Sequence, residues 1–587
     1  MRKFSCDFET TVDDLDETRV WAYAICEIGN FDNFIYGNSL DDFLKWCSNK
    51  RENYLCFFHN LKFDGEFIMN RLFQMGYKWV KDKKDIVDKS FTSLITEMGQ
   101  FYSIEVYFSG TGTKHVNKVT FYDSLKIINS SVEDIAKDFG LEISKLKINY
   151  KTHREVGHVL TEEEINYIRN DVEIIARVLD FIFKQKLTKM TIASDALYFY
   201  KQTINFDNYF PKLDKLEDDN IRSSYKGGFT YLNPTYKGIN VSNGVVLDVN
   251  SLYPSVLRYE NLPFGRPVYF EGKYQDDKLY NLYVQCFSCS FKLKKGKIPS
   301  IQIKNSIFYA TNEYLETSEV YKNGELVSDI ITLTLTNVDL ELFFEQYEVS
   351  DIVYHYGYKF KSMQGLFNKY VDYWTEQKIK AKKEGNKSMY KLSKLMLNSL
   401  YGKFGLNPKS VLKEPYYDCG VVKYRYQEPE YREPIYIPIA TFVTSYARRK
   451  TITTSQKIKD FTISNYGKDY YIYSDTDSIH MLEMPDEVIK SFVDVDDYRL
   501  GAWKIESRFT SGKFLRQKCY LEDFNGKLNM TVAGLPKKMA SLVNFNNFNV
   551  GLKIEAEAQP EEKQKLAFKH IKGGIILVPT DFSIKDK

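Results

Sequence analysis

Hydrophobic and polar residues alternate in some segments of this chain and cluster in others, and this spacing predicts its strands. Residues 4–10 alternate with period two, which places Asp7 and Glu9 on one face of a strand and the apolar side chains on the other. Residues 54–58 and 244–249 are short, continuous apolar runs, a pattern typical of buried strands. Two acidic residues are therefore predicted to lie side by side on one strand face.

A helix and a hairpin follow from two other spacings. Residues 161–183 repeat apolar positions every three or four residues behind a capping box formed by Thr161 and Glu164, which predicts an amphipathic helix. The apolar segments 470–473 and 479–482 flank a tight turn and predict two paired strands.

The turn of this hairpin carries Asp475 and Asp477. Two carboxylates this close repel each other, so one would normally keep its proton. A divalent cation removes that conflict, which makes the turn a candidate Mg²⁺ site. Because Asp and Ser are common turn formers, an ordinary acidic turn is an equally good interpretation of the hairpin alone.

Length and composition limit the class of protein. The chain has 587 residues, too many for one core, and we expect three to five structural units. It carries 81 basic and 78 acidic residues, so a nucleic-acid site would have to concentrate positive charge in a channel. The eight scattered cysteines form no disulfide framework, which indicates a reducing compartment, and no apolar run is long enough to span a membrane.

Further acidic positions accompany Asp7 and Glu9. If the chain turns helical after residue 58, Asn60 and Asp64 share a helix face at i, i+4. Tyr167 and Asp171 lie one turn apart on the predicted helix 161–183. Each piece alone also fits a solvated surface strand or helix.

The second half of the chain adds a strand and a helix with polar residues at defined places. Asp248 ends the buried strand 244–249, from which it can reach an ion held by the hairpin. On a helix, Lys394, Asn398 and Tyr401 fall on one face at i, i+4 and i+7, although Lys394 alone would more often be a solvated lysine. Lys518 and Tyr520 are predicted to share one strand face.

These motifs resemble, in order, those of family B DNA polymerases. Asp-x-Glu, Asn-x3-Asp and Tyr-x3-Asp follow the order of the 3′→5′ exonuclease domain. Asp248 with residues 251–254 (Ser-Leu-Tyr-Pro) resembles motif A, residues 391–402 resemble motif B, and the hairpin resembles motif C. Two insertions, at about residues 260–359 and 405–438, make the chain similar to the protein-primed, phi-29-type bacteriophage subgroup. The second insertion is expected to lead into a strand at Ile439–Thr441.

The resemblance implies an α/β multidomain fold, with an RNase H-like exonuclease domain and a right-hand polymerase domain. The expected segments are 1–185 (exonuclease), 186–259 (first part of the palm, motif A), 260–358 (first protein-priming insertion), 359–404 (fingers, motif B), 405–438 (second protein-priming insertion, for strand displacement and processivity), 439–510 (second part of the palm, motif C) and 511–587 (thumb and C-terminus).

For the exonuclease domain, the resemblance implies residues of three kinds. The expected metal ligands are Asp7, Glu9, Asp64 and Asp171. Tyr167 would orient the attacking water and Lys145 would assist, although Lys145 lies in a lysine-rich stretch that also fits a solvated face. The expected DNA contacts are Thr10, His59, Asn60, Phe63 and Asp123.

For the polymerase domain, the resemblance implies a second set. The expected metal ligands are Asp248, Val249, Asp475 and Asp477, with the three acids catalytic. The expected dNTP contacts are Val249, Ser251, Leu252, Tyr253, Lys378, Lys394, Asn398 and Tyr401, with Tyr253 excluding a ribose 2′-OH. The expected DNA contacts are Tyr225, Gly227, Gly228, Lys518 and Tyr520. Residues 384–387 make a longer finger tip than in the relatives, so Lys391 receives no role.

The implied activity is DNA-directed DNA polymerisation from a terminal-protein primer on a linear viral genome, with strand displacement and proofreading. Two Mg²⁺ ions per site, or Mn²⁺, would serve two-metal phosphoryl transfer. The expected partners are DNA template and primer, dNTPs, a terminal protein and a viral single-stranded DNA-binding protein, with the enzyme a monomer in the host bacterial cytoplasm. Two alternatives stay open: a family B polymerase primed by nucleic acid, and an exonuclease with a DNA-binding C-terminal half.

Overall fold

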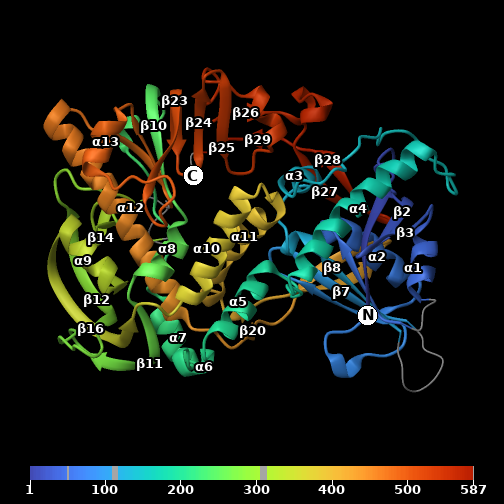
Figure 1. The fold of residues 1–587 in the computed structure, drawn as a ribbon, viewed down its shortest axis with the longest axis horizontal. Coiled ribbons are helices and arrows are strands. Elements are labelled where there is room, and N and C mark those ends of the chain that lie inside the picture. The colour runs from blue at the N-terminus through green and yellow to red at the C-terminus, as the bar shows by residue number, and fades with distance from the viewer. Residues whose placement is uncertain (49–51, 109–116, 304–313, 586–587) are drawn as a thin grey trace.

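The chain forms a mixed α/β structure built on three larger sheets (Figure 1). The computed structural model describes residues 1–48, 52–108, 117–303 and 314–585. Figure 1 shows the N-terminal sheet at one end of the molecule, strands β12 and β16 at the other, and the helices α10 and α11 between them. The multidomain α/β architecture predicted from sequence is confirmed.

The N-terminal sheet has eight strands. They are, in spatial order, β3 (Asn30–Gly37), β2 (Val20–Glu27), β1 (Arg2–Thr10), β4 (Tyr54–Phe58), β8 (Lys118–Asp123), β7 (Phe101–Tyr107), β6 (Ser90–Ile95) and β5 (Lys78–Trp79). The face with Phe4, Cys6 and Phe8 packs on α1 (Leu40–Ser48) and α2 (Leu61–Gln74), and α4 (Glu162–Lys184) covers β2 on the opposite face. The Thr161–Glu164 capping box starts α4 as predicted, and α3 (Val132–Asp138) packs beside it.

A seven-stranded sheet carries the hairpin and the strand that ends in Asp248. Its strands are, in order, β25 (Lys527–Val532), β24 (Cys519–Phe524), β23 (Trp503–Arg516), β10 (Asn240–Val249), β22 (Ser478–Leu482), β21 (Tyr471–Asp475) and β9 (Thr230–Leu232). Helices α8 (Leu252–Tyr259), α12 (Ile437–Tyr466) and α13 (Asp486–Phe492) accompany it. Because β10 lies between β22 and β23, Asp248 comes directly beside the hairpin.

Helices α10 (Asn368–Lys383) and α11 (Lys387–Phe404), the segment expected to form the fingers, are an antiparallel pair against which α5 (Ile192–Thr203) packs. Gly385 turns the chain at their tip with φ +69°, a conformation that glycine adopts without strain. The tip lies against the N-terminal domain, where Lys391 Nζ is 2.6 Å from Asp138 Oδ2 and Ser388 Oγ donates to the Phe139 carbonyl at 2.7 Å. This contact gives Lys391 a structural partner outside the site.

The first insertion is a four-stranded sheet with one helix on it. Its strands are, in order, β11 (Leu262–Glu271), β16 (Tyr347–Met363), β12 (Leu282–Leu293) and β15 (Ile331–Thr336), with α9 (Asn337–Gln346) and the hairpin β13 (Val320–Lys322) and β14 (Glu325–Ser328). Short helices α6 (Phe206–Tyr209) and α7 (Lys215–Arg222) precede it.

The second insertion and the C-terminal region are made of two-stranded pieces. The insertion contains the pairs β17 (Lys409–Ser410) with β20 (Glu430–Tyr431) and β18 (Lys413–Asp418) with β19 (Val421–Tyr426). The C-terminal region contains β26 (Lys553–Ile554) with β29 (Phe582–Ser583) and β27 (Leu566–Ile571) with β28 (Gly574–Pro579). Both β19 and β28 pack against α2, so these late segments return to the N-terminal domain.

Three details of the sequence prediction are corrected by the fold. Ile439–Thr441 is helical, within α12, because Pro438 suits a first helical turn and a short apolar run does not distinguish a strand from a buried helix. The predicted boundary at 358/359 falls inside β16, and the boundary at 510/511 falls inside β23. Strand β16 pairs with β11 as far as Met363, and β23 pairs with β24 as far as Arg516, so neither predicted boundary separates two structural elements.

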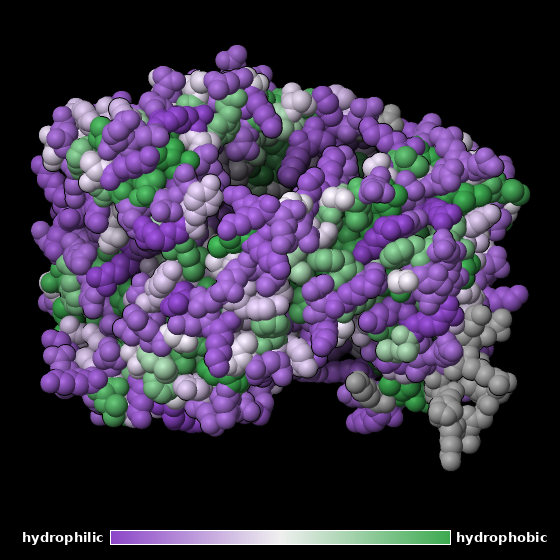
Figure 2. All heavy atoms as spheres, in the orientation of Figure 1, coloured by the Kyte–Doolittle hydropathy of each residue, from purple (hydrophilic) through white to green (hydrophobic). Residues whose placement is uncertain are grey.

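The surface in Figure 2 is mostly hydrophilic and is hollowed between the finger helices and the strands above them. In the described part of the chain, each helix is too short or too polar to cross a membrane.

Candidate active sites

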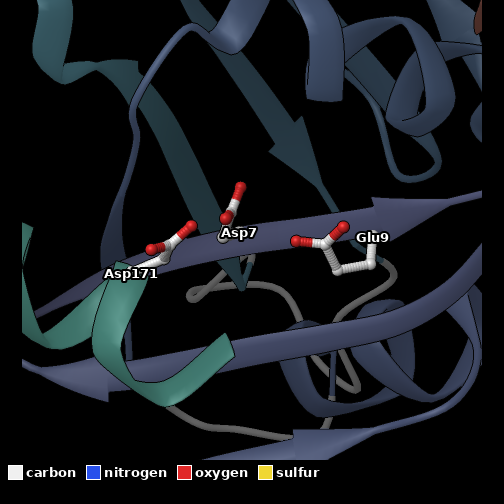
Figure 3. A group of neighbouring side chains, drawn as sticks. All are labelled: Asp7, Glu9 and Asp171. Atoms are coloured by element: carbon white, nitrogen blue, oxygen red, sulfur yellow. The ribbon is translucent and has the colours of Figure 1, made fainter. Parts of the chain in front are cut away.

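Three acidic side chains converge in the N-terminal domain. Asp7 and Glu9 project from the same face of β1, and Asp171 reaches them from α4 (Figure 3). One oxygen from each lies within 4.8 Å of the others. Glu9 and Asp171 are buried, whereas Asp7 keeps partial contact with solvent. The period-two spacing therefore predicted the pair, and the helix supplies the third acid.

Asp64 completes this group, which we call the N-terminal site (Asp7, Glu9, Asp64 and Asp171). It comes from the first turn of α2, directly after β4, the strand beside β1. Among the described residues, Oδ1 of Asp64 and Oδ1 of Asp171 are buried without a hydrogen-bond partner. A buried carboxylate oxygen without a partner is costly, and bound cations of the hard, oxygen-preferring kind would satisfy both.

The N-terminal site favours protonated carboxyls when no cation neutralises them. Burial and the Asp171 charge raise the pKa of Asp7 to about 7. Burial and the Asp7 charge also raise the pKa values of Glu9 and Asp64 well above their usual range. Asp7, Glu9 and Asp171, with Asp64 near enough to be affected by the charges of Asp7 and Glu9, therefore form a candidate cation site whose occupancy depends on pH.

Tyr167 and Lys145 lie at the edge of the N-terminal site. Lys145 Nζ forms an ion pair with Asp171, which opposes the rise that burial gives to the Asp171 pKa. The Tyr167 hydroxyl is 2.7 Å from the Tyr150 hydroxyl, on the α4 face that carries Asp171. The structure thus brings both residues to the acids, as the sequence order suggested.

The residues predicted to contact DNA near this site lie at a strand end, at a helix N-cap and among aromatic rings. Thr10 ends β1, and Phe63 packs against Phe67 and Phe568. Asn60 is not inside the helix, as the i, i+4 argument assumed, but is its N-cap with φ 86°. A left-handed Asn at the strand-to-helix turn leaves its side chain free of a capping hydrogen bond.

Asp123 and His59 are used internally. The Asp123 carboxylate is buried and accepts the backbone N–H groups of Asn60, Leu61 and Leu125. His59 bonds Ser124 Oγ through Nδ1 and the Ser130 carbonyl through Nε2. These contacts hold the Asn60 turn in place.

The second acidic group, which we call the hairpin site, consists of Asp248, Asp475 and Asp477. Strands β21 and β22 pair through a two-residue turn, in which Thr476 has φ +60°. Asp248 pairs in register with Ser478, and the Val249 N–H donates to the Asp477 carbonyl at 2.8 Å. The strand end and the turn are thereby joined, which confirms the predicted hairpin and its neighbour.

Two lysines contact the acids of the hairpin site. Lys504 Nζ lies 3.5 Å from Asp248 Oδ1, and Lys518 Nζ lies 2.7 Å from Asp475 Oδ1. Lys518 is in the turn before β24 with φ +54°, so it does not share a strand face with Tyr520 as predicted. Burial and the charge of Asp477 raise the pKa of Asp248 to about 6.

A cleft of about 480 Å³ opens over this site. Its lining adds polar residues that the sequence motifs did not single out, namely Glu506, His480 and Glu522. Lys504 and Glu506 lie two positions apart in β23, and this spacing is the only feature of the sequence that marks them. Because the sequence does not show which strands lie beside β23, this spacing is equally typical of any half-exposed strand and does not identify a site.

The expected nucleotide contacts gather beside Asp248. Ser251 turns the chain with φ +55°, and Lys378 from α10 lies 3.3 Å from its hydroxyl. Tyr253 stacks on Tyr401 of α11 with ring centroids 4.0 Å apart. Leu252 is buried, which leaves only its backbone available to a ligand.

The finger helices add positive charge to this side. Lys394 and Asn398 are exposed on the α11 face that also carries Tyr401. Burial and repulsion from Lys394, Lys382 and Lys504 lower the pKa of Lys378. A polyanion bound here would relieve that repulsion.

The loop that precedes β9 touches both the hairpin turn and α12. Arg448 donates to the carbonyls of Lys226 and Gly227 at 2.8 Å each. A Cβ on Gly228 would lie 2.7 Å from the Thr476 side chain, so the missing side chain makes room for the turn. Tyr225 lies against Gly405, at the end of α11. Gly228 thus approaches the hairpin turn closely, whereas a Cβ on Gly227 would meet open space.

Comparison with known proteins decides the family. A family model described as DNA polymerase type B, organellar and viral, matches residues 46–493. The chain belongs to the organellar and viral type B DNA polymerases. It is 43% identical over 608 aligned positions to the DNA polymerase of Bacillus phage Nf, covering 100% of both chains, and 41% identical to that of Bacillus phage phi29, covering 100% of this chain and 99% of the relative.

Structural similarity to the phi29-type polymerases extends over the whole chain. The structure titled phi29 DNA polymerase complexed with primer-template DNA and incoming nucleotide substrates matches with a TM-score of 0.89, 40% identity and 100% coverage of both chains. The protein is therefore a DNA-directed DNA polymerase of bacteriophage type that acts in DNA replication, which removes the alternative of an exonuclease with a merely DNA-binding C-terminal half.

Proposed function

We propose that this polymerase replicates a linear viral genome from a terminal-protein primer, with strand displacement, and that it proofreads by 3′→5′ exonuclease action at a separate site. The observation that carries the two activities is the presence of two carboxylate groups, the N-terminal site on one sheet and the hairpin site on another. Two such groups on different sheets suit two phosphoryl-transfer reactions.

At the hairpin site, Asp248, Asp475 and Asp477 would hold two Mg²⁺ ions, with the Val249 carbonyl as a further ligand. Bound ions would lower the pKa of the primer 3′-hydroxyl and stabilise charge on the phosphates. Lys378 and Lys394 would bind the triphosphate, and Asn398 and Tyr401 would close over the new base pair. Tyr253, held against Tyr401, would exclude a 2′-hydroxyl.

Primer binding would change the pairing of Lys518. In the structure its ammonium neutralises Asp475. A metal ion at Asp475 would compete for that carboxylate, so Lys518 would turn to a primer phosphate beside Tyr520. Before substrate binds, the positive charge of Lys518 would reduce the repulsion between Asp475 and the other acids of the hairpin site.

At the N-terminal site, Asp7, Glu9, Asp64 and Asp171 would hold the ions that activate water and stabilise the leaving 3′-oxygen. Tyr167 would orient that water, and Lys145 would balance the negative charge of Asp171. Thr10, Asn60 and Phe63 would grip the single-stranded 3′ end, with His59 and Asp123 fixing the Asn60 turn.

Protein priming is supported by the two insertions. The segments expected from the sequence to be the protein-priming insertions form a separate four-stranded sheet between α8 and α10 and strand pairs between α11 and α12. Two of the matching phi29 polymerase structures are complexes with primer-template DNA, and one of these also holds incoming nucleotide substrates, which supports DNA and dNTPs as partners here. A terminal protein, a single-stranded DNA-binding protein, a monomeric state and a host cytoplasmic location remain proposals.

The test of protein priming is deoxynucleotidylation of a terminal protein co-expressed with the polymerase. Labelled dNTP should become covalently attached to that protein, and Asp475→Ala should abolish the labelling while Asp7→Ala leaves it. Extension of a DNA primer without labelling of any candidate protein would instead favour a family B polymerase primed by nucleic acid.

A further inference from the structure

A histidine and a glutamate form a buried pair inside the polymerase cleft. His480 comes from β22 and Glu522 from β24, with β10 and β23 between these strands in the sheet order. His480 Nδ1 nevertheless lies 2.7 Å from Glu522 Oε1. The sheet must curl to bring them together, and both residues line the cleft over the hairpin site.

The pair is polar in a largely aromatic environment. The side chains of His480 and Glu522 are 3% and 2% exposed. The contact between His480 Nδ1 and Glu522 Oε1 restrains the orientation of the imidazole ring. Burying such a pair costs desolvation that an apolar pair would avoid, so its contribution to stability is small.

Three aromatic rings surround the imidazole. The ring centroids of Tyr520, Tyr473 and Phe514 lie 5.1, 5.4 and 5.6 Å from that of His480. Tyr473 and Tyr520 also contact each other, with centroids 5.2 Å apart. A fixed imidazole therefore sets the positions of both tyrosines.

Tyr473 connects this cluster to the reacting groups. Its hydroxyl donates to Asp475 Oδ2 at 3.3 Å and accepts the Lys518 N–H at 2.9 Å. One ring thus holds the catalytic carboxylate and the turn that carries the primer-binding lysine. Displacement of that ring would move both together.

We propose that the Glu522–His480 pair is a positioning element of the polymerase site, which fixes Tyr473 and Tyr520 and thereby sets where Asp475 meets the primer 3′ end. The inference rests on the proposed roles of Asp475, Lys518 and Tyr520. Neither residue of the pair touches the reacting atoms in this account, so both act through the tyrosines.

Glu522→Ala and Glu522→Gln test the hydrogen bond. Glu522→Ala should lower kcat for dNTP addition roughly 10- to 100-fold, as loss of a supporting contact does. The KM for dNTP should stay within roughly threefold, because the triphosphate contacts are on the fingers. Glu522→Gln keeps an acceptor for Nδ1–H and should retain most of kcat. Wild-type kcat in Glu522→Ala, or an equal loss in both variants, would overturn the proposal.

A double variant separates positioning from folding. His480→Phe with Glu522→Leu fills the same space with apolar groups and should keep or raise the melting temperature. It should still lose kcat, while degradation of single-stranded DNA stays at the wild-type rate. His158→Phe, which breaks the His158–Glu164 contact in the N-terminal domain, is the matched control and should leave primer extension unchanged.

A folded double variant with wild-type kcat would overturn the inference. Failure of the proposed function is a different result, because it would appear as continued polymerisation by Asp475→Ala whatever the Glu522 variants do.

Discussion

The two acidic sites use the same ligand chemistry in opposite surroundings. In the N-terminal site, one oxygen each from Asp7, Glu9 and Asp171 lies within 4.8 Å of the others, and one lysine pairs with Asp171. In the hairpin site, Asp248 and Asp475 each have their own lysine, and within the described residues the three acids do not form such a tight group. The first site is therefore assembled before ions bind, whereas the second requires its lysines to exchange partners.

This difference suits the two proposed tasks. A preassembled site acts on any 3′ end that reaches it, so control lies in DNA delivery. A site whose acids are neutralised by Lys504 and Lys518 is completed only when primer and nucleotide bring phosphates for these lysines. Substrate binding and assembly of the polymerase site would then be one event.

The largest effect expected is a reciprocal loss of activities. Asp475→Ala should lower polymerisation at least about 10³-fold and spare 3′→5′ degradation, since a metal ligand supports several kcal/mol of transition-state stabilisation. Asp7→Ala should do the reverse. Primer extension and degradation of a labelled single strand measure both, with the exposed Asp497→Ala and Glu163→Ala as controls. Loss of both activities in either variant would mean that the sites are not separate.

Sugar selection should change only at the hairpin site. Tyr253 stacks on Tyr401 and cannot withdraw without losing that contact. Tyr253→Val should reduce the preference for dNTP over rNTP roughly 10- to 200-fold, the range for losing packing in a pocket. Single-nucleotide incorporation with each triphosphate gives the ratio, and the degradation rate should not change. An unaltered ratio would remove Tyr253 from this role.

The pH dependence of ion binding should distinguish the sites. Protons compete with metal at each carboxylate, so apparent Mg²⁺ affinity should rise about tenfold per pH unit per displaced proton below the pKa. The rise should continue to at least about pH 7 at the N-terminal site, where Glu9 and Asp64 also have raised pKa values, whereas the Asp248 contribution at the hairpin site should end near pH 6. Degradation and extension rates titrated with Mg²⁺ at several pH values provide the test. If the apparent Mg²⁺ affinity changed with pH in the same way at both sites, the proposed difference in their carboxyl pKa values would be wrong.

The folding stability of the chain without Mg²⁺ should decrease as pH rises, because the pKa of Asp7 is raised in the folded state. Asp7 binds its proton more tightly in the folded chain, where its pKa is about 7, than in the unfolded chain. Its stabilising contribution is thus complete below about pH 4 and is lost as pH rises to about 7. Without Mg²⁺, the melting temperature should therefore fall over that interval, and Asp7→Asn should flatten the fall.

The smallest effect is expected at the finger tip. Lys391 and Asp138 form an ion pair between the fingers and the N-terminal domain, and both are partly exposed. Such pairs contribute at most about 1 kcal/mol, so Lys391→Ala should change either activity less than about fivefold. The ratio of degradation to extension on one primer is the measurement, with Lys383→Ala as the control. A tenfold shift in that ratio would show that the tip couples the two sites.

Local patterns predicted the parts of the sites that each lie on one element. The alternation at residues 4–10, the capping box at Thr161 and the hairpin around Asp475 all appear in the structure. The pairing of Lys518 with Asp475 could not be predicted, because it joins positions 43 residues apart through the curl of a sheet. Ile439 was assigned to a strand because a buried helix and a buried strand share the same apolar run.

Polar residues outside motifs were the hardest to assign. Glu506 and Glu522 look like ordinary strand residues until β23 and β24, paired in one sheet with β10 and β22, bring them to the cleft. For Asp123, the motif did not indicate that its carboxylate accepts backbone N–H groups, because the acceptor and the Asn60 donor lie 63 residues apart.

Gly228 and Thr476 restrict the order in which this enzyme can accumulate substitutions. A Cβ at position 228 would meet the Thr476 side chain at 2.7 Å, while Thr476 itself occupies a left-handed conformation that glycine tolerates better. A change of Thr476 to glycine can therefore come first, and alanine at position 228 can follow it. The reverse order passes through an overpacked turn beside Asp475. Diverging lineages that hold a side chain at 228 should then carry a small residue at 476.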